Sequence, residues 1–221
     1  MILFTVRSIH ITMMPNKPIC QGYMFFCMAE KGCVWEFHPL SNAVGGNPVD
    51  VESCLVQLTD TGKMVHDLIR YLHHLRYPKL SFNVYMYNCF ATHPLLAELC
   101  QVWIESCGTC KQQFLGFPKM LKDERHAKLQ HDFRSGAVND GVATLLWIKS
   151  SPVTMMSIFH PLSGEDSLML RMRKHPGNKS TNASGANSTF HSGELQKELD
   201  TPVLIYAYNQ HKVGVDMADQ Y

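Results

Sequence analysis

The sequence predicts a mixed α/β fold, because stretches with the character of strands and of helices follow one another along the chain. Apolar runs of strand length occur before residue 40 and again after residue 140. Between them lies the i, i+3, i+4, i+7 stripe of an amphipathic helix, formed by Val65, Leu68, Ile69 and Leu72. The chain has 221 residues, of which 45% are hydrophobic. This is enough to form a buried core in one large domain or two small ones.

The first two strands are predicted on either side of a turn at Glu30-Lys31-Gly32. Residues 22–29 are a continuous apolar run with aromatic side chains, and their number suits a buried strand. Residues 33–37 alternate between apolar and polar side chains, which is typical of a half-buried strand. The two runs and the turn together predict a β-hairpin.

Two helices and a strand are predicted in the middle of the chain. Thr61 is a suitable N-cap for a first helix that ends near Leu75. Residues 80–87 are rich in aromatic and apolar side chains and predict a strand. A second helix is predicted over residues 92–106, and we expect Gly108 to end it, because glycine is favoured just beyond a helix C-terminus.

The second half of the chain is predicted to be mostly strands, followed by a linker and a short helix. Residues 142–148 and 153–159 are apolar and have the length of strands. Residues 174–193 are rich in Asn, Ser, Gly and Thr and have little to bury, which predicts a flexible linker. A helix over residues 202–209 would start at Pro202, where proline is well tolerated.

The charge balance gives no general support for nucleic-acid binding. Twenty basic residues face 19 acidic ones, for a formal net charge of +1, whereas a DNA-binding domain usually has a clear basic excess. A DNA site would therefore have to be a local patch, and a solvated basic face is the stronger interpretation of each candidate. The candidates are residues 171–174 and residues 119–128, which contain Lys119, Lys122, Arg125 and Lys128.

The sequence contains no signal for secretion or membrane insertion. Its apolar start is only six residues long, and no stretch approaches the ~20 apolar residues of a membrane span. We therefore expect a nuclear or cytoplasmic protein without a membrane partner, whose eight cysteines are reduced. Cys107-Gly-Thr-Cys110 is then interpreted as two structural thiols, because it follows a predicted helix and lacks further zinc ligands at suitable spacing.

Five segments, taken in order, resemble the piggyBac transposase family. None is specific alone, but together they span nearly the whole chain. They are Arg7-Ser8 with Pro15-Asn16-Lys17-Pro18, the strand into Glu30-Lys31-Gly32, Tyr87-Asn88-Cys89-Phe90-Ala91-Thr92, Gly108-Thr109 with Gly116-Phe117-Pro118-Lys119, and Tyr208-Asn209 with Gly214-Val215-Asp216-Met217-Ala218-Asp219-Gln220.

The resemblance implies a ribonuclease H-like mixed sheet with flanking helices, interrupted by a mostly β insertion. On this basis we expect residues 1–116 to form the first part of the core and residues 117–173 the insertion. Residues 174–198 would be the linker, and residues 199–221 would return to the core, which is expected to be truncated at its C-terminus. The family's members also carry three aspartates that bind two Mg²⁺ ions, which clamp the attacking and leaving oxygens of a phosphodiester.

The three acid positions implied by the resemblance are only partly retained. Glu30 occupies the first position, one methylene longer than aspartate. Tyr87 occupies the second, and a phenol is neutral at pH 7 and cannot replace a bridging carboxylate. Asp216 keeps the third. After Gly108-Thr109 the family favours a basic residue, and Lys111 keeps that charge.

The sequence therefore predicts a transposase-derived protein that has lost its chemistry, either a remnant or a domesticated derivative. We expect Glu30 and Asp216 to be vestigial and Mg²⁺ to bind only if activity remains. DNA binding would be weak, through Lys111, Lys119, Lys122 and Arg125. No small-molecule substrate is expected, and the oligomeric state is left open.

Three alternatives to this prediction stay open. The chain could be a non-enzymatic interaction domain, a working metal-dependent transposase or nuclease, or a chain that forms no stable fold. Trp147 could stack on an unpaired base, but packing within the insertion is the stronger interpretation of this residue.

Overall fold

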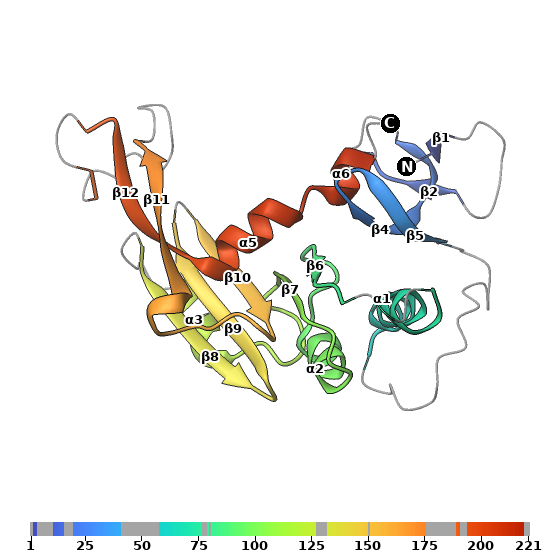
Figure 1. The fold of residues 1–221 in the computed structure, drawn as a ribbon, viewed down its shortest axis with the longest axis horizontal. Coiled ribbons are helices and arrows are strands. Elements are labelled where there is room, and N and C mark those ends of the chain that lie inside the picture. The colour runs from blue at the N-terminus through green and yellow to red at the C-terminus, as the bar shows by residue number, and fades with distance from the viewer. Residues whose placement is uncertain are drawn as a thin grey trace. The chain divides into compact units, whose positions relative to one another are not determined.

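The computed structural model describes residues 2–3, 11–15, 20–40, 58–76, 79, 81–126, 132–149, 151–175, 189–190 and 194–218. The chain forms two compact units, shown in Figure 1. The first unit contains Met1–Ser81 and His211–Tyr221, and the second contains Phe82–Gln210. Most of the predicted linker, part of the first motif, and Lys128 lie outside the described residues.

The first unit contains the predicted hairpin. Strands β4 (Phe25–Glu30) and β5 (Cys33–Pro39) pair antiparallel. Lys31 and Gly32 form the turn with φ angles of 48° and 85°, as a two-residue hairpin loop requires. A second, three-stranded sheet has the order β1-β3-β2 and consists of β1 (Ile2–Leu3), β2 (Thr12–Met13) and β3 (Gln21–Tyr23).

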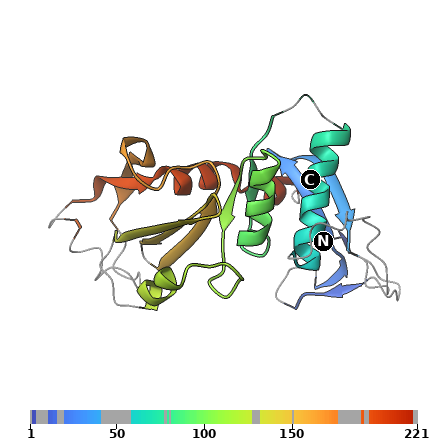
Figure 2. The same ribbon diagram turned by 90° about the horizontal axis from the view of Figure 1, so that it is seen from below.

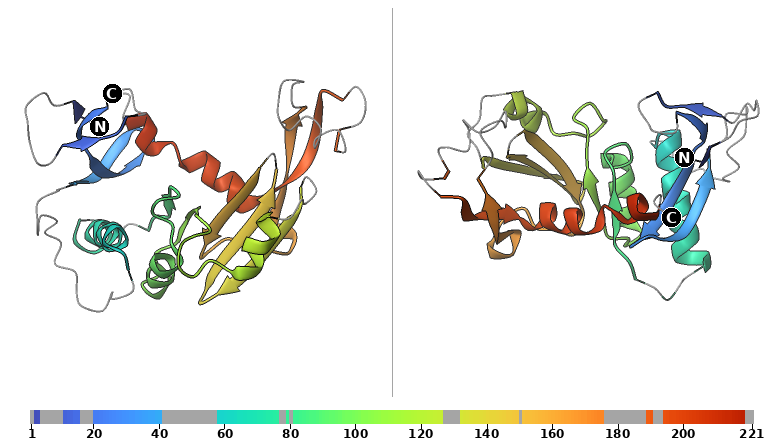
Figure 3. Two further views of the ribbon diagram at one scale, coloured as in Figure 1. Left: turned by 180° about the vertical axis from the view of Figure 1, so that it is seen from behind. Right: turned by 90° about the horizontal axis from the view of Figure 1, so that it is seen from above.

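Two α-helices, α1 and α6, accompany these strands in the described part of the first unit. Helix α1 (Asp60–Arg70) begins after Thr59, whose Oγ1 accepts a hydrogen bond from the Gly62 N–H at 3.1 Å. The predicted cap, Thr61, is wrong by two residues, because Thr61 lies inside the helix and Thr59 makes the capping hydrogen bond instead. The helix continues as a π-helix, η1 (Tyr71–Arg76). Helix α1 lies against β5 (Figure 2), and α6 (Gly214–Ala218) lies along β4 (Figure 3).

The second unit contains a five-stranded sheet in the order β6-β7-β10-β9-β8. Strands β6 (Val84–Met86) and β7 (Ser106–Thr109) are parallel, while β8 (Arg134–Asn139), β9 (Val142–Ile148) and β10 (Pro152–Ser157) form an antiparallel meander. Strands from the predicted core and from the predicted insertion thus share one mixed sheet.

Both faces of this sheet are buried. On one face, helix α5 (Val203–His211) packs through Leu204, Ile205 and Tyr208 against a core that includes Leu145 and Trp147. Side chains alternate along a strand, so Leu146 faces the other way, and it is fully buried as well. Helix α2 (His93–Gln101) packs against β7, β9 and β10, and α3 (Lys119–His126) against β8.

A two-stranded ribbon completes the described part of the second unit. Strands β11 (Leu168–Lys174) and β12 (Gln196–Pro202) pair antiparallel, and the 3₁₀ helix η2 (Glu165–Ser167) precedes them. Among the helices in the described ranges, none combines the length and the apolar character that crossing a membrane requires.

The predicted second helix was too long. It ends at Gln101, and Trp103 follows in the left-handed region with φ of 60°. The main-chain N–H of Ile104 bonds to the Leu99 carbonyl at 3.0 Å, which closes the helix end. Gly108 therefore does not end a helix but lies inside strand β7. Strand β7 has only four residues, so its alternating side-chain pattern is too short to stand out from the helical pattern before it.

Candidate functional site

Tyr87, which the resemblance places in the second acid position, follows the end of strand β6 directly. Its carbonyl oxygen accepts hydrogen bonds from the N–H groups of Phe90 at 2.9 Å and Ala91 at 3.3 Å. These bonds form a tight turn that leads into helix α2, with Thr92 as the extended residue before it. The turn lies at the carboxyl end of two parallel strands, where α/β proteins commonly bind ligands. The backbone thus presents position 87 at a favourable edge, but the side chain there is a half-buried phenol.

Gly108 makes this arrangement of the backbone possible. A Cβ atom at this position would lie 2.3 Å from the Met86 carbonyl oxygen and 2.9 Å from the Ala91 Cβ. Both distances are shorter than van der Waals contact, so only glycine allows β7 to approach β6 and the turn so closely. The Gly108-Thr109 segment therefore supports the position of Tyr87 sterically.

Lys111 brings a positive charge to the same edge. Partial burial raises the pKa of the Cys89 thiol in the Tyr87 turn, and the positive charge of Lys111 opposes that rise. The Lys111 ammonium also lies 5.7 Å from the centre of the Phe114 ring, within the range of a cation–π contact. Lys111 therefore places a positive charge near the turn that carries Tyr87.

His93 has a structural position beside this edge. Its side chain is buried, and Nε2 lies 3.2 Å from the Asn139 carbonyl oxygen, at the hairpin between β8 and β9. Gly116 adopts a φ of 81°, and a Cβ atom there would lie 2.6 Å from the Cβ of His93. The Gly116-Phe117-Pro118 segment thus folds over His93, which connects α2 to the hairpin and is not presented to a substrate.

Glu30 and Asp216, which the resemblance places in the other two acid positions, both belong to the first unit. Glu30 ends strand β4; its side chain is 60% exposed and lies 3.8 Å from the Lys31 ammonium. Asp216 is exposed on helix α6. A Cβ atom at Gly214 would lie 2.3 Å from the Ala29 carbonyl oxygen and 3.4 Å from the Glu30 Cα. Gly214 therefore lets α6 contact the end of β4 that carries Glu30.

Sequence reasoning missed this role of Gly214. The available signal was its place at the start of a helical segment. Glycine is a poor helix former, so a glycine there suggests that a close contact excludes a side chain.

Tyr87 lies in the second unit. The structure thus brings Glu30 and Asp216 into one unit and Tyr87 with Lys111 into the other.

The remaining predicted DNA contacts lie on helix α3. Lys119 is exposed and Lys122 is half-buried. Arg125 is directed at the sheet instead: its Nη1 donates to the Thr154 Oγ1 at 3.1 Å, and that hydroxyl donates to the Cys110 carbonyl at 2.7 Å. Arg125 thus connects α3 to β10 and, through Thr154, to Cys110 just after β7. Of these three residues Lys119 is the most accessible to a phosphate backbone.

The cysteine pair lies in and just after strand β7, with both side chains buried. Burial raises the pKa of Cys107 and of Cys110 to about 12. At neutral pH both are thiols, and thiols are poor nucleophiles and poor metal ligands. Trp147 is also buried, and its Nε1 donates to the Asp132 carboxylate at 2.7 Å. The burial of the two thiols and of the hydrogen-bonded indole agrees with the interpretation of these residues as structural.

Among the described residues, no group of three or more His, Cys, Asp or Glu side chains suited to a metal ion occurs. The resemblance implies a second acid where this chain has Tyr87. An uncharged phenol does not fit the role of the carboxylate that Mg²⁺ prefers.

Comparisons with known proteins agree with this architecture. A family model described as "Transposase IS4" matches residues 1–221. The fold is similar to that of piggyBac transposase in a cryo-EM structure of its synaptic complex with hairpin DNA. The TM-score is 0.64 and the identity 19% over 98% of this chain, which spans 37% of the length of that one. No curated protein matches the chain. Because the family model covers its whole length, the chain belongs to the Transposase IS4 family, and its fold is like that of piggyBac transposase.

Proposed function

We propose that this protein is a catalytically inactive derivative of a cut-and-paste DNA transposase. The observation that carries the proposal is Tyr87, at the end of a parallel strand where the family resemblance places a metal-binding acid. We include in the proposal a ribonuclease H-like arrangement of the core, which the resemblance implies.

The physical argument is one of charge and coordination. Two divalent cations and a phosphodiester need several carboxylate oxygens to hold the metals and offset their charge. An uncharged phenol supplies one weak oxygen and no negative charge. Glu30 does not compensate, since it is exposed and lies near the Lys31 ammonium. Such a chain keeps the scaffold of a nuclease without the charge that its chemistry requires.

A cleavage assay tests the proposal. The purified chain is incubated with hairpin-ended DNA and Mg²⁺ or Mn²⁺, and we expect no nicked or opened product. Metal-dependent nicking that is lost in both Glu30→Gln and Asp216→Ala would establish an active nuclease and refute the proposal. Nicking that persists unchanged in both variants is due to a contaminant. Calorimetric titration adds a direct measurement: binding of two Mg²⁺ ions, abolished by Asp216→Ala, would also favour the active alternative.

We further propose that the protein retains weak DNA binding through Lys111 and Lys119. Lys111 lies at the edge that carries Tyr87, and Lys119 is exposed on α3. A gel shift with random duplex DNA should show binding that weakens as salt rises, because phosphate contacts release counterions. Binding should weaken in Lys111→Gln/Lys119→Gln but not in the control Lys63→Gln, which removes the half-buried cation of an ion pair in helix α1.

A non-enzymatic interaction domain is the second candidate. Two observations favour it: the net charge of +1, and Arg125, whose guanidinium bonds to Thr154 within the fold. The gel shift distinguishes the two. A complete absence of binding at low salt would favour a protein partner over DNA.

A further inference from the structure

Strand β8 is the last strand on one side of the five-stranded sheet, and its outer edge pairs with no strand among the described residues (Figure 1). Its inner edge pairs with β9 over residues 134–139 without a bulge. Gly136 and Val138 are both exposed. Tyr87 follows β6, which is at the opposite end of the sheet order. The outer edge of β8 is therefore separate from the candidate functional site.

The turn at residues 140–141 determines which backbone groups of β8 point outward. Its φ angles of 46° and 75° are those of a two-residue hairpin loop. Asn139 and Val142, which flank such a loop, are then a hydrogen-bonded pair. The bond from the Ile148 N–H to the Phe133 carbonyl, at 2.9 Å, agrees with this pattern. Because hydrogen-bonded and non-hydrogen-bonded pairs alternate in antiparallel strands, the backbone groups that point away from β9 are those of residues 134, 136 and 138.

These outward groups are available to another strand. No backbone group in the part of the chain that the structure describes bonds to them. Native proteins commonly protect a free edge with proline, charged side chains or a bulge. Residues 135–139 contain neither proline nor a charged side chain. The outer edge of β8 is therefore suited to the addition of a strand.

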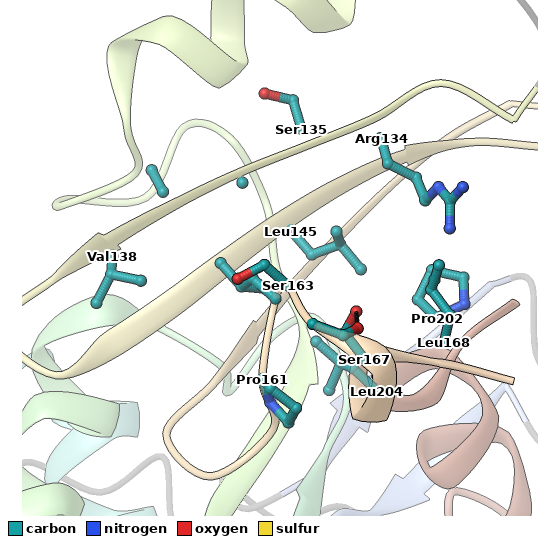
Figure 4. Close-up of a pocket in the computed structure, with 14 residues that line it drawn as sticks. Arg134, Ser135, Val138, Leu145, Pro161, Ser163, Ser167, Leu168, Pro202 and Leu204 are labelled. Carbon is teal, nitrogen blue, oxygen red and sulfur yellow. Dashed lines mark hydrogen bonds between the residues drawn. The ribbon is translucent and has the colours of Figure 1, made fainter.

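A hollow of about 530 Å³ lies along the same strand. Residues 134–138 line one side of it and the loop at residues 161–164 another. Figure 4 shows Val138 and Ser135 on opposite sides of β8. Val138 is 68% exposed, and Leu162 covers Gly136 so closely that a Cβ atom there would lie 2.8 Å from its Cδ1. An apolar side chain from an added strand would thus find an apolar contact in Leu162.

We propose that β8 pairs antiparallel with β8 of a second copy of this chain, so that one sheet continues through a homodimer. Pairing residue 136 with residue 138 of the other copy satisfies outward groups on both strands. Ala137 then lies opposite its own counterpart on the two-fold axis, as a symmetric dimer requires. The exposed Val138 of each copy lies opposite Gly136 and beside Leu162 of the other. The edge is thus complementary to itself.

The charges at the ends of the paired strands favour this orientation. In this register Arg134 of one copy lies opposite Asp140 of the other, a turn residue whose side chain is 70% exposed. Such an exposed pair contributes little free energy, and Asp132, two residues before Arg134, offsets part of its charge. The backbone bonds and the apolar contacts therefore hold the dimer, while the opposite charges select the antiparallel direction.

Sedimentation velocity of the purified chain, without DNA and under reducing conditions, tests the proposal. We expect a reversible monomer–dimer equilibrium with a dissociation constant of about 1–100 µM, because one pair of short strands forms a small interface. Val138→Lys should weaken it at least about tenfold, since lysine protects a strand edge from pairing. Leu170→Lys is the matched control and should dimerise like the wild type, because Leu170 is 64% exposed on β11. Thermal melts check that both variants fold.

Oxidative cross-linking tests the register. Ala137→Cys places two thiols at the two-fold axis in a non-hydrogen-bonded pair, where the Cα atoms lie about 4.5 Å apart and a disulfide can form. Mild oxidation should give a covalent dimer on a non-reducing gel, above the background that the exposed Cys20, Cys33 and Cys89 give in the wild type. Ser135→Cys should give only that background, because its counterpart lies about 13 Å away along the strand.

Several results would overturn the proposal. One is a chain that remains monomeric at about 300 µM, well above the expected dissociation constant. Another is a dimer that Val138→Lys leaves unchanged, since β8 would not then form the interface. A covalent dimer from Ser135→Cys but not from Ala137→Cys would exclude the register. If Val138→Lys does not fold, the comparison of the two cysteine variants decides alone.

Discussion

Raising the pH should destabilise the fold through two buried thiols. Cys107 is fully buried and Cys110 is 5% exposed. Burial disfavours the thiolate and raises the pKa of each to about 12, from a usual value of 9.0. The nearby Arg125 charge and the Thr154 hydroxyl lower the pKa of Cys110 but do not offset its burial.

The sign and size follow from proton linkage. Between pH 9 and 12 the unfolded chain has lost these two protons and the folded chain has kept them. The folded state therefore binds more protons, and stability falls as pH rises through this window. At pH 10 each thiol should cost about 1.4 kcal/mol relative to pH 7, so the pair should cost about 3 kcal/mol. That is a large part of the 5–15 kcal/mol that is typical of folded proteins.

Urea denaturation at pH 7, 9 and 10 under reducing conditions measures the effect. The control is Cys107→Ala/Cys110→Ala, which lacks both thiols but keeps Tyr85, whose pKa burial also raises. The free energy of unfolding of the wild type should fall between pH 7 and pH 10 by about 3 kcal/mol more than that of the control. Parallel pH dependence in the two proteins would refute the assignment of buried thiols to strand β7.

Three further substitutions test particular contacts. Gly214→Ala should lower the free energy of unfolding by about 2–3 kcal/mol, because its Cβ would lie 2.3 Å from a backbone oxygen of β4; Gly62→Ala, in helix α1, should cost far less in the same urea titration. Trp147→Phe should cost about 1–3 kcal/mol in a thermal melt, since it leaves the Asp132 carboxylate without the 2.7 Å indole donor. Trp103→Gly should raise the melting temperature, because glycine relieves a φ of 60° at a side chain that is 92% exposed.

The sequence predicted the elements that short-range signals define. The β4–β5 hairpin was correctly predicted because a turn with Gly32 separates two apolar runs. Strands β9 and β10 were predicted as well, since most of their side chains are apolar. Helix α5 begins one residue after the predicted start at Pro202. In each case the local pattern and the tertiary structure favour the same conformation.

Strand β7 and the end of α2 could not be predicted in this way. Trp103 takes the left-handed position that glycine usually occupies, so the helix end carries no sequence signal. The four residues of β7 become a strand because they pair with β6 and β10, contacts that are remote in sequence. At the candidate site, the sequence predicted that Tyr87 lies at the end of a strand. The close contacts of Gly108 and Gly214 could be found only from the atomic positions.

These close contacts show which motif residues the fold itself requires. Gly108 and Gly214 are required by sterics, because a Cβ at either position would lie 2.3 Å from a backbone oxygen. Replacing either glycine would therefore force two elements apart. At position 87 the backbone carbonyl accepts the hydrogen bonds that hold the turn. If the protein is the inactive derivative that we propose, selection for its fold alone should still keep both glycines, and both are present.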